Sequence, residues 1–275
     1  MKLKKSLFFL IKNISFSLPL MAVLPPGFAE GPAAEEWTGP HVGVSIGAVL
    51  SKADISTNIG GITDTSYFSN STDLNHIQNA TNFSESRSTG TLAIQVGQDF
   101  SWGQKVLGVI FDFNGMRSDS SKSATGTYSG SANTYTTRSS LNLNWLATFR
   151  GRIGYSSYFH HWPSLTYLTA GPAFALMKAE NSFSDTNSYL GAGGNQTSSY
   201  QLGWTAGIGL ELKTTNHMSV DIEYLYVHLP SIENNSEISN SAPGFGVPTG
   251  SITNNFSSQS SLDLNLFNIR LNYRF

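Results

Sequence analysis

The feature that most constrains the fold of this chain is an alternation of apolar and polar residues with period two, which recurs in eight segments. Successive side chains of a strand point to opposite faces, so this period is typical of a sheet whose two faces meet different environments. Most of the segments reach the roughly 9–11 residues that a tilted strand needs to cross a bilayer. The predicted strands are His41–Leu50, Thr89–Phe100, Val106–Met116, Ser140–Tyr155, Leu165–Lys178, Tyr200–Lys213, Met218–Leu229 and Ser261–Phe275.

The connections between these strands alternate between long and short. The long ones are rich in Ser, Thr, Asn and Gly and cover 51–88, 117–139, 179–199 and 230–260, whereas the short ones cover 101–105, 156–164 and 214–217. A closed up-and-down barrel with two chemically different rims requires such an alternation. We therefore predict an all-β fold, an eight-stranded antiparallel up-and-down transmembrane β-barrel with four long external loops. An even strand count places both termini beside the short turns.

Period two also assigns the faces of the strands. A soluble sandwich alternates in the same way, but the strand lengths, the loop alternation and the N-terminal segment favour a membrane barrel, which turns its apolar face outward. In the fourth strand this face carries Leu141, Leu143, Trp145, Ala147 and Phe149, which we expect to meet lipid.

Charged residues of the opposite parity are expected inside the barrel. Eight strands leave an interior only wide enough for side chains to fill. Because burying unpaired charges is costly, we predict a paired charge network in the lumen. A narrow gated ion path through the same residues is the alternative. The predicted network comprises Asp112, Arg150, Arg152, Glu211, Asp221, Glu223 and Arg270.

Two places depart from regular alternation. Pro172 lacks an N–H to donate to a neighbouring strand, so Gly171–Pro172 predicts a bend or a bulge. In the last strand the apolar parity changes between Leu266 and Phe267, which predicts either a bulge there or the point where the strand leaves the bilayer.

The N-terminal segment has the features of a secretory signal. Lys2, Lys4 and Lys5 precede apolar stretches, and Gly27–Phe28–Ala29 supplies the small residues that a cleavage site needs. We predict a signal peptide over 1–29, a short periplasmic lead over 30–36 and the barrel over 37–275.

Composition excludes several classes of function. The chain has no cysteine, which excludes disulfides, thiolate catalysis and cysteine metal sites. It has 16 Lys and Arg and 18 Asp and Glu; without the four leader lysines, 12 basic residues remain and the net charge is −6. Nucleic acid is therefore not an expected partner, and we expect no cofactor.

Two histidine motifs have both a catalytic or metal-binding interpretation and an ordinary structural one. His228, Ser231 and Glu233 offer a base, a nucleophile and an acid, but closeness in sequence does not establish the geometry of a triad, so we favour ordinary rim residues. His160–His161 suggests a metal or haem site, but neighbours on an extended segment point to opposite faces, so we favour a polar turn.

The C-terminal segment Ile269–Phe275 alternates and ends in an aromatic residue. It resembles the sorting strand of outer-membrane barrels, which the barrel-assembly machinery recognises, so Tyr273 and Phe275 are the predicted assembly signal. Further segments are similar to the OmpA-like, opacity-type surface-antigen barrels, although Pro40 stands where that family more often has an aromatic residue. These segments are Trp37–Gly43, Gly151–Tyr155, Gly203–Gly207, Glu223–Tyr224 and Asn272–Phe275.

The resemblance implies a barrel in the cell outer membrane, surrounded by its lipids and assembled with periplasmic chaperones and the barrel-assembly machinery. It implies a structural, antigenic or adhesin-like surface role; a small porin and a lipid-modifying enzyme are the alternatives. The loop segments 181–199 and 230–260 contain no Lys or Arg, so they offer no basic lipopolysaccharide-binding patch. We expect the loops to form a flexible solvated surface, the alternative being contact with a host ligand through Tyr67, Phe68, Phe83, Tyr189, Phe245 or Phe256.

Overall fold

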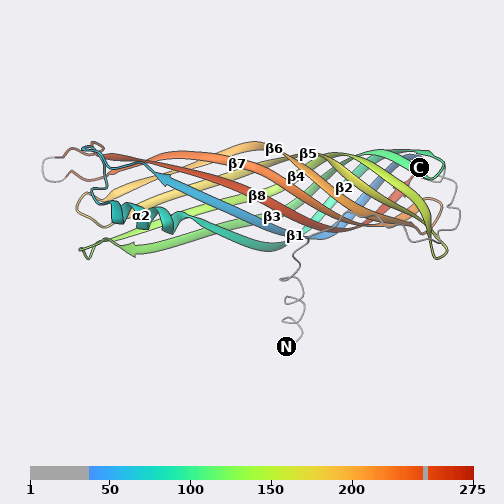
Figure 1. Cartoon of the computed structure of the whole chain (residues 1–275), viewed down its shortest axis with the longest axis horizontal. Helices are drawn as coiled ribbons and strands as arrows, with labels where there is room; N and C mark the ends of the chain where they lie inside the picture. Colours follow the sequence, from blue (N-terminus) through green and yellow to red (C-terminus); the bar gives the residue numbers. More distant parts are fainter. Residues whose placement is uncertain (1–36, 244–246) are drawn as a thin grey trace, which may run out of the picture.

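The eight strands form one closed antiparallel barrel, in which β1 pairs with both β2 and β8 (Figure 1). The computed structural model describes residues 37–243 and 247–275, so the predicted signal peptide, the predicted lead and Phe245 lie outside the described residues. The strands are β1 (Gly39–Ile59), β2 (Phe83–Trp102), β3 (Lys105–Thr127), β4 (Thr134–Phe159), β5 (Trp162–Asp185), β6 (Gly191–Lys213), β7 (Met218–Asn240) and β8 (Thr253–Arg274). The prediction of an eight-stranded antiparallel barrel is confirmed.

The two ends of the barrel differ as the sequence predicts. At one end, called the terminal end, β1 begins, β8 finishes and the connections are tight: Phe159 pairs with Trp162 across a two-residue turn in which His160 has φ +58°. The other end carries the helix α2 (Ser71–Thr81) and is called the cap end (Figure 1). Asn70 accepts a hydrogen bond from the backbone N–H of Thr72 at 2.8 Å and so caps the helix. Within the described residues, no helix is long and apolar enough to cross a membrane.

The strands are much longer than their apolar alternation predicts, and the extra length lies toward the cap end. They have 20 to 26 residues, so β3 runs on to Thr127 and β7 to Asn240 through segments predicted as flexible loops. That part of the loop prediction is wrong. Its physical cause is a reversal of the two faces: toward the cap end the outward side chains are polar and the apolar side chains point inward.

β8 shows this reversal directly. Leu262, Leu264 and Leu266 are buried, whereas Phe267 and Ile269 are 49% and 57% exposed. The register is nevertheless continuous, because Leu266 pairs with Val49 and Leu225 while the next residue keeps the same offset to both neighbours. The predicted bulge at this point is therefore wrong, and the change of parity marks a change in the surroundings of a regular strand.

β4 reverses its faces through a real β-bulge. The register shifts between Leu143 and Leu146, so that Leu141 and Leu143 are buried while Phe149 is 51% exposed. The expectation that Leu141 and Leu143 meet lipid is therefore wrong, because one extra residue turns them inward. No register shift occurs at Gly171–Pro172: Thr148 pairs with Ala173 and Gly151 with Ala170 at the same offset.

An apolar core fills the barrel toward the cap end. Its residues come from six of the strands and are almost completely buried. Such a core is typical of a water-soluble β-barrel, in which the apolar face points inward. Its members are Val49, Ala53, Ile55, Met116, Leu141, Leu143, Leu146, Ala173, Ala175, Met177, Ala179, Leu225, Val227, Leu229, Ile232, Leu262, Leu264 and Leu266.

Candidate functional site

A buried charge network occupies the barrel interior between this apolar core and the terminal end. All seven predicted lumen residues have at most 3% of their surface exposed. Arg150 donates from Nη1 to Glu223 Oε1 at 2.7 Å and from Nη2 to Asp112. Arg270 donates to Asp221 at 2.6 Å and to Glu223 Oε2 at 2.9 Å. Two guanidinium groups thus share one carboxylate, as the forked geometry of arginine allows.

The second part of the network lies nearer the terminal end and includes residues that the sequence reading did not select. Arg152 donates to Glu211 at 3.0 Å and to Asp99, and Arg274 also donates to Asp99 at 2.9 Å. Asp99 and Arg274 lie at inward-facing positions of the alternation in their strands, so the sequence pattern could have identified both. Tyr167, whose hydroxyl lies 2.9 Å from Asp221 Oδ1, gave no such signal because apolar residues occupy both parities of β5.

Trp37 closes the terminal end of the interior. Its ring is fully buried, and its indole N–H donates to Ser156 Oγ at 2.9 Å. The Arg274 guanidinium donates to the Trp37 carbonyl at 2.5 Å and lies 5.7 Å from the ring centre. Trp37, just before β1, is therefore held by Arg274 at the end of β8, across the β1–β8 seam.

The cap end is closed by the β1–β2 connection, which folds inward with α2. Its apolar side chains pack with residues from β1, β4, β5, β7 and β8. Tyr67, Phe68 and Phe256 are at most 7% exposed, so these candidates for ligand contact are buried inside the cap. The prediction of exposed loop aromatics fails for them because the extended strands enclose the loop. The buried members are Ile59, Tyr67, Phe68, Leu74, Ile77, Tyr135, Phe183, Ile238 and Phe256.

One carboxylate joins three of the connections at the cap end. Asp185 Oδ2 accepts hydrogen bonds from Tyr67 Oη at 2.7 Å and from Tyr128 Oη at 2.5 Å, and Oδ1 accepts from the Gly191 N–H at 2.7 Å. Burial raises the pKa of both phenols above their ordinary value, and the bond to Asp185 adds to the shift. The phenols therefore remain neutral donors to this carboxylate.

Replacing Asp185 with alanine is expected to loosen the cap without opening the barrel. The hydrogen bonds from Tyr67, Tyr128 and the Gly191 N–H to the carboxylate are lost. A hydrogen bond to a charged group is worth about 1.5–3 kcal/mol. The β1–β2 connection should then be cut rapidly by chymotrypsin near Tyr67 and Phe68, while the cleaved protein keeps the heat-modifiable mobility of a closed barrel. The matched control is Asp64→Ala, an exposed carboxylate of the same connection. Equal cleavage of both variants would contradict the role of Asp185.

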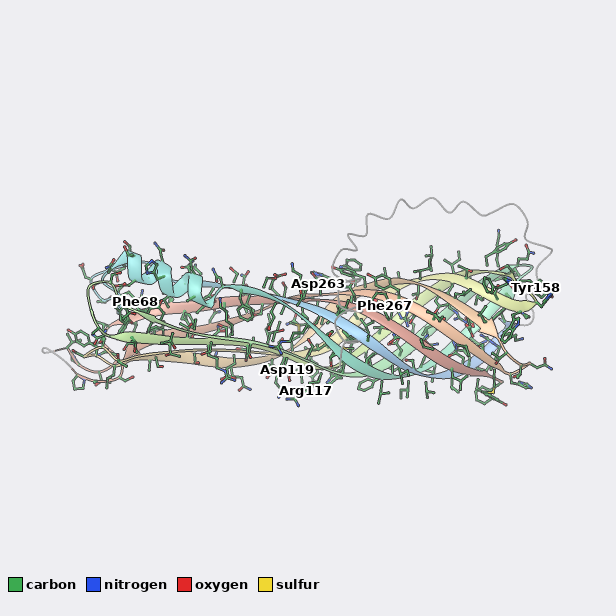
Figure 2. All side chains as sticks on the ribbon, turned by 90° about the horizontal axis from the view of Figure 1, so that it is seen from below. Phe68, Arg117, Asp119, Tyr158, Asp263 and Phe267 are labelled. Carbon is green, nitrogen blue, oxygen red and sulfur yellow. The ribbon has the colours of Figure 1, made fainter. Side chains whose placement is uncertain are left out.

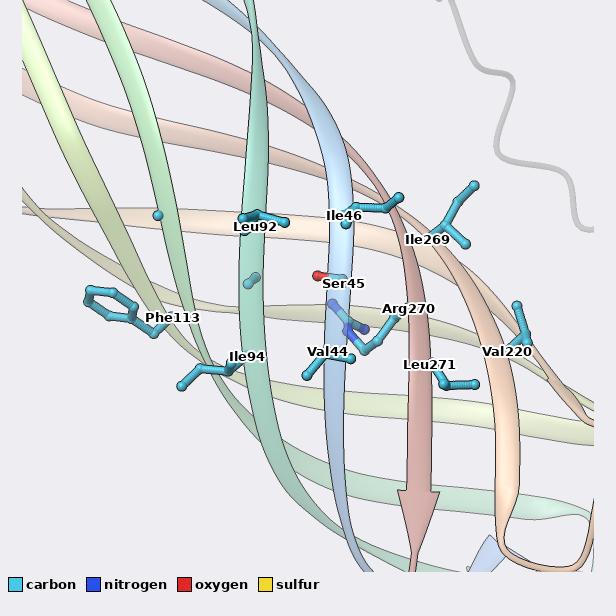
Figure 3. A pocket seen from close by; sticks show the side chains of 12 residues that line it. Val44, Ser45, Ile46, Leu92, Ile94, Phe113, Val220, Ile269, Arg270 and Leu271 are labelled. Atoms are coloured by element: carbon cyan, nitrogen blue, oxygen red, sulfur yellow. The ribbon is translucent and has the colours of Figure 1, made fainter.

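The outer face of the barrel carries a broad apolar belt on the terminal-end side. Val44, Ile46, Leu92 and Ile94 are 59% to 68% exposed. Together with Phe113, Val220, Ile269 and Leu271 they line a shallow groove across β7, β8, β1, β2 and β3 (Figure 3). Aromatic residues flank the belt: Trp145 stacks on Phe113 with ring centres 5.8 Å apart, and Tyr226 lies 5.3 Å from Trp204. An exposed apolar belt with aromatic borders fits a bilayer.

The comparisons with known proteins decide the family. Residues 17–275 match the family described as outer membrane protein beta-barrel domain. The chain belongs to this outer-membrane β-barrel family. It is 26% identical over 196 residues to the 31 kDa outer-membrane immunogenic protein of Brucella melitensis, covering 70% of this chain and 71% of the relative. A 79-residue match to the 25 kDa outer-membrane immunogenic protein of Brucella ovis is 35% identical and covers 29% of this chain and 32% of the relative.

Solved structures with a similar fold are more distant. The attachment invasion locus protein Ail of Yersinia pestis has a TM-score of 0.32 at 12% identity, covering 86% of this chain and 99% of Ail. The outer membrane protease OmpT of Escherichia coli has a TM-score of 0.35 at 7% identity, covering 86% of this chain and 97% of OmpT. The family match over residues 17–275 shows an outer-membrane β-barrel protein, and its relatives are named as immunogenic. In such barrels the short turns face the periplasm, so the terminal end of this outer-membrane barrel is periplasmic and its cap end extracellular.

The residues of the catalytic interpretation are only partly brought together in this outer-membrane barrel. His228 Nδ1 lies 2.7 Å from Oδ1 of Asp263, an acid that the sequence reading did not consider, and Tyr226 donates to the same oxygen at 3.0 Å. Glu233 instead accepts from Gln259 at 3.1 Å. No hydrogen bond joins Ser231 to His228 in the described part of the chain. His160 and His161 form the tight β4–β5 turn.

The predicted assembly residues lie at the periplasmic rim, pointing outward. Tyr273 is 44% exposed and Phe275 is 69% exposed, with ring centres 5.1 Å apart. The Phe275 N–H donates to the Pro40 carbonyl at 3.1 Å. Phe275 thus joins the β1–β8 seam through its backbone and leaves its ring accessible.

Proposed function

We propose that this outer-membrane barrel is a non-conducting surface protein whose extracellular half is a rigid, folded platform for antigenic or adhesive contacts. The observation that carries the proposal is the filling of the interior. Trp37 and the charge network fill the periplasmic half, the apolar core fills the extracellular half, and the cap closes the outer end. The relatives named as immunogenic support an antigenic role.

The apolar core distinguishes this proposal from the small-porin alternative. An ion crossing the barrel would have to pass the buried side chains of Leu143, Met177 and Leu264, which offer it no polar partner. The charges nearer the periplasm are held in mutual ion pairs such as Arg150–Glu223. Paired charges below an apolar plug favour a structural interior.

Purified protein refolded into planar bilayers is therefore expected to show no steady conductance steps. The Asp185→Ala variant should behave in the same way, because opening the cap leaves the apolar core beneath it. Stable, reproducible single-channel steps with the wild-type protein, at a frequency proportional to the protein added, would contradict a closed interior and favour the porin.

Contacts with a host or an antibody would fall on the exposed tips of the connections. Leu190 is 50% exposed and has φ +46°, a conformation that is strained for a branched residue, and Ile62 is 43% exposed. Tyr189 and Leu190 accept backbone hydrogen bonds from Ser241 and Ala242, so two connections support each other. A platform held in this way presents a fixed surface, in contrast to the flexible one expected from composition.

We propose a structural role for His228 and Asp263 as well. They lie on neighbouring strands, paired across β7 and β8, at the outer border of the apolar belt. Polar and aromatic residues at this height interact with the interface of the bilayer. Within the described residues no hydrogen bond joins Ser231 to His228, and Glu233 accepts from Gln259 instead, which supports a non-catalytic interpretation.

A further inference from the structure

The outer wall of β3, β4 and β5 changes abruptly from apolar to polar at one height. On β3 the outward residue Phe113 is followed four positions later by Arg117. On β4 the bulge brings Trp145 and Asn144 to the outer face, one apolar and one polar. On β5 the outward Phe174 is followed four positions later by Lys178. This height marks the outer border of the membrane on this wall.

The polar residues above this border are neighbours on adjacent strands. Asn142 pairs across the sheet with Asp119 on one side and with Lys178 on the other. The Arg117 side chain is 82% exposed and uses only Nε to bind Asp119, at 2.5 Å. With its amide oriented to satisfy its neighbours, Asn142 donates to Asp119 Oδ1 at 3.2 Å. Both terminal nitrogens of Arg117 and the ammonium of Lys178 therefore remain available on one surface.

The opposite wall has the opposite charge at a similar height. Lys52 lies 3.1 Å from Asp54 and pairs across the sheet with Asp263. Further toward the cap end, β7 adds Glu233 and Glu237, both exposed. Figure 2 shows Arg117 and Asp119 on one side of the barrel and Asp263 on the other, all between the Phe68 end and the Tyr158 end. The β3–β5 wall also carries Asp119, which is paired with Arg117, and the partly exposed Glu180. The exposed Arg117 and Lys178 favour an anion between them on this wall, whereas the carboxylates of the β7–β1 wall repel one.

We propose that Arg117, Asn144 and Lys178 bind a phosphate group of a phosphorylated glycolipid in the outer leaflet. A guanidinium with two free nitrogens matches two phosphate oxygens, and the Lys178 ammonium and the Asn144 amide supply further donors. The aromatic row formed by Phe113, Trp145 and Tyr200 lies directly below, with Trp145 6.4 Å from Tyr200. Such a row suits the sugar and the first part of the acyl chains, while the charge complementarity of the wall above it selects the headgroup.

The test measures binding of bisphosphorylated lipid A to the refolded full-length protein in detergent micelles. Each basic group near an anionic headgroup surface contributes roughly fivefold in affinity, so the double variant R117Q/K178Q should bind about 25-fold more weakly. The matched control is K52Q, which removes one positive charge at a similar height on the acidic wall and should bind like wild type. K178R, which keeps the charge, should bind within about twofold of wild type.

Chemically dephosphorylated lipid A should bind wild type and R117Q/K178Q equally weakly, because the phosphate contact is then absent from both. Retention of heat-modifiable mobility shows that each variant is folded. Equal losses in K52Q and R117Q/K178Q would overturn the proposal, since the effect would follow net charge. Binding of phosphatidylglycerol as tight as that of lipid A, with the same dependence on Arg117 and Lys178, would overturn the glycolipid assignment.

Discussion

Replacing Arg150 with methionine is expected to lower the free energy of unfolding in detergent by about 3–5 kcal/mol, the range for breaking a buried ion pair by removing one partner. Arg150 is fully buried and pairs with Asp112 and Glu223. Without it, Asp112 loses its ion pair with Arg150, and Glu223 is left sharing Arg270 with Asp221. The loss is large because the remaining charges are left in the interior, where water does not compensate them.

A rescue variant separates this explanation from lost packing. R150M/D112N/E223Q removes the orphaned charges as well, and neutral replacement of a buried ion pair is often tolerated. It should recover at least half of the stability lost in R150M. R117M is the matched control: it removes an arginine from an exposed pair and should change stability by about 0–1 kcal/mol. Urea titrations followed by tryptophan fluorescence measure all three, and a stable R150M would show that the network is not closed to solvent.

The barrel was predictable from the sequence because each membrane-crossing strand meets two fixed environments. Arg150, Glu223 and Phe149 follow strict alternation through the apolar belt, so parity alone placed them on the correct face. The seven predicted lumen charges are all buried for the same reason. The individual ion pairs could not be predicted from the sequence, since partners such as Asp99 and Arg274 come from strands at opposite ends of the chain.

The extracellular half was not predictable from the same pattern. There the outward face meets water and the apolar residues Leu262, Leu264 and Leu266 point inward, so the change of parity alone could not separate a bulge from a strand leaving the bilayer. The long Ser- and Asn-rich stretches resemble loops because their outward residues need not be apolar. Their backbone groups nevertheless pair with neighbouring strands, as Thr137 with Ala124 does. The composition of a segment indicates whether its side chains meet water or lipid. Whether its backbone forms a strand depends on pairing with segments that are distant in the sequence.

Removal of Phe275 is expected to reduce the amount of barrel at the cell surface sharply while leaving the finished barrel stable. The ring is 69% exposed, so burial contributes little of the roughly 1–3 kcal/mol available to a fully buried aromatic residue. The seam is held from His41 to Ile59 by many other pairs, and Arg274 binds the Trp37 carbonyl independently. An accessible aromatic end on an already secured strand is suited to recognition before closure, which supports the assembly signal implied by the family resemblance.

The matched control is Phe159→Ala, which removes an outward aromatic residue of 54% exposure from another strand at the same rim. Surface labelling of intact cells should show a much lower level for the Phe275 deletion than for Phe159→Ala, with degradation of the missing protein in the periplasm. Both proteins, refolded in detergent, should show the heat-modifiable mobility of a closed barrel and unfold at similar urea concentrations. Wild-type surface levels for the deletion would refute the sorting role. No assembly machinery is present in detergent, so failure of the deletion to refold in detergent would show that Phe275 acts instead through the stability of the seam.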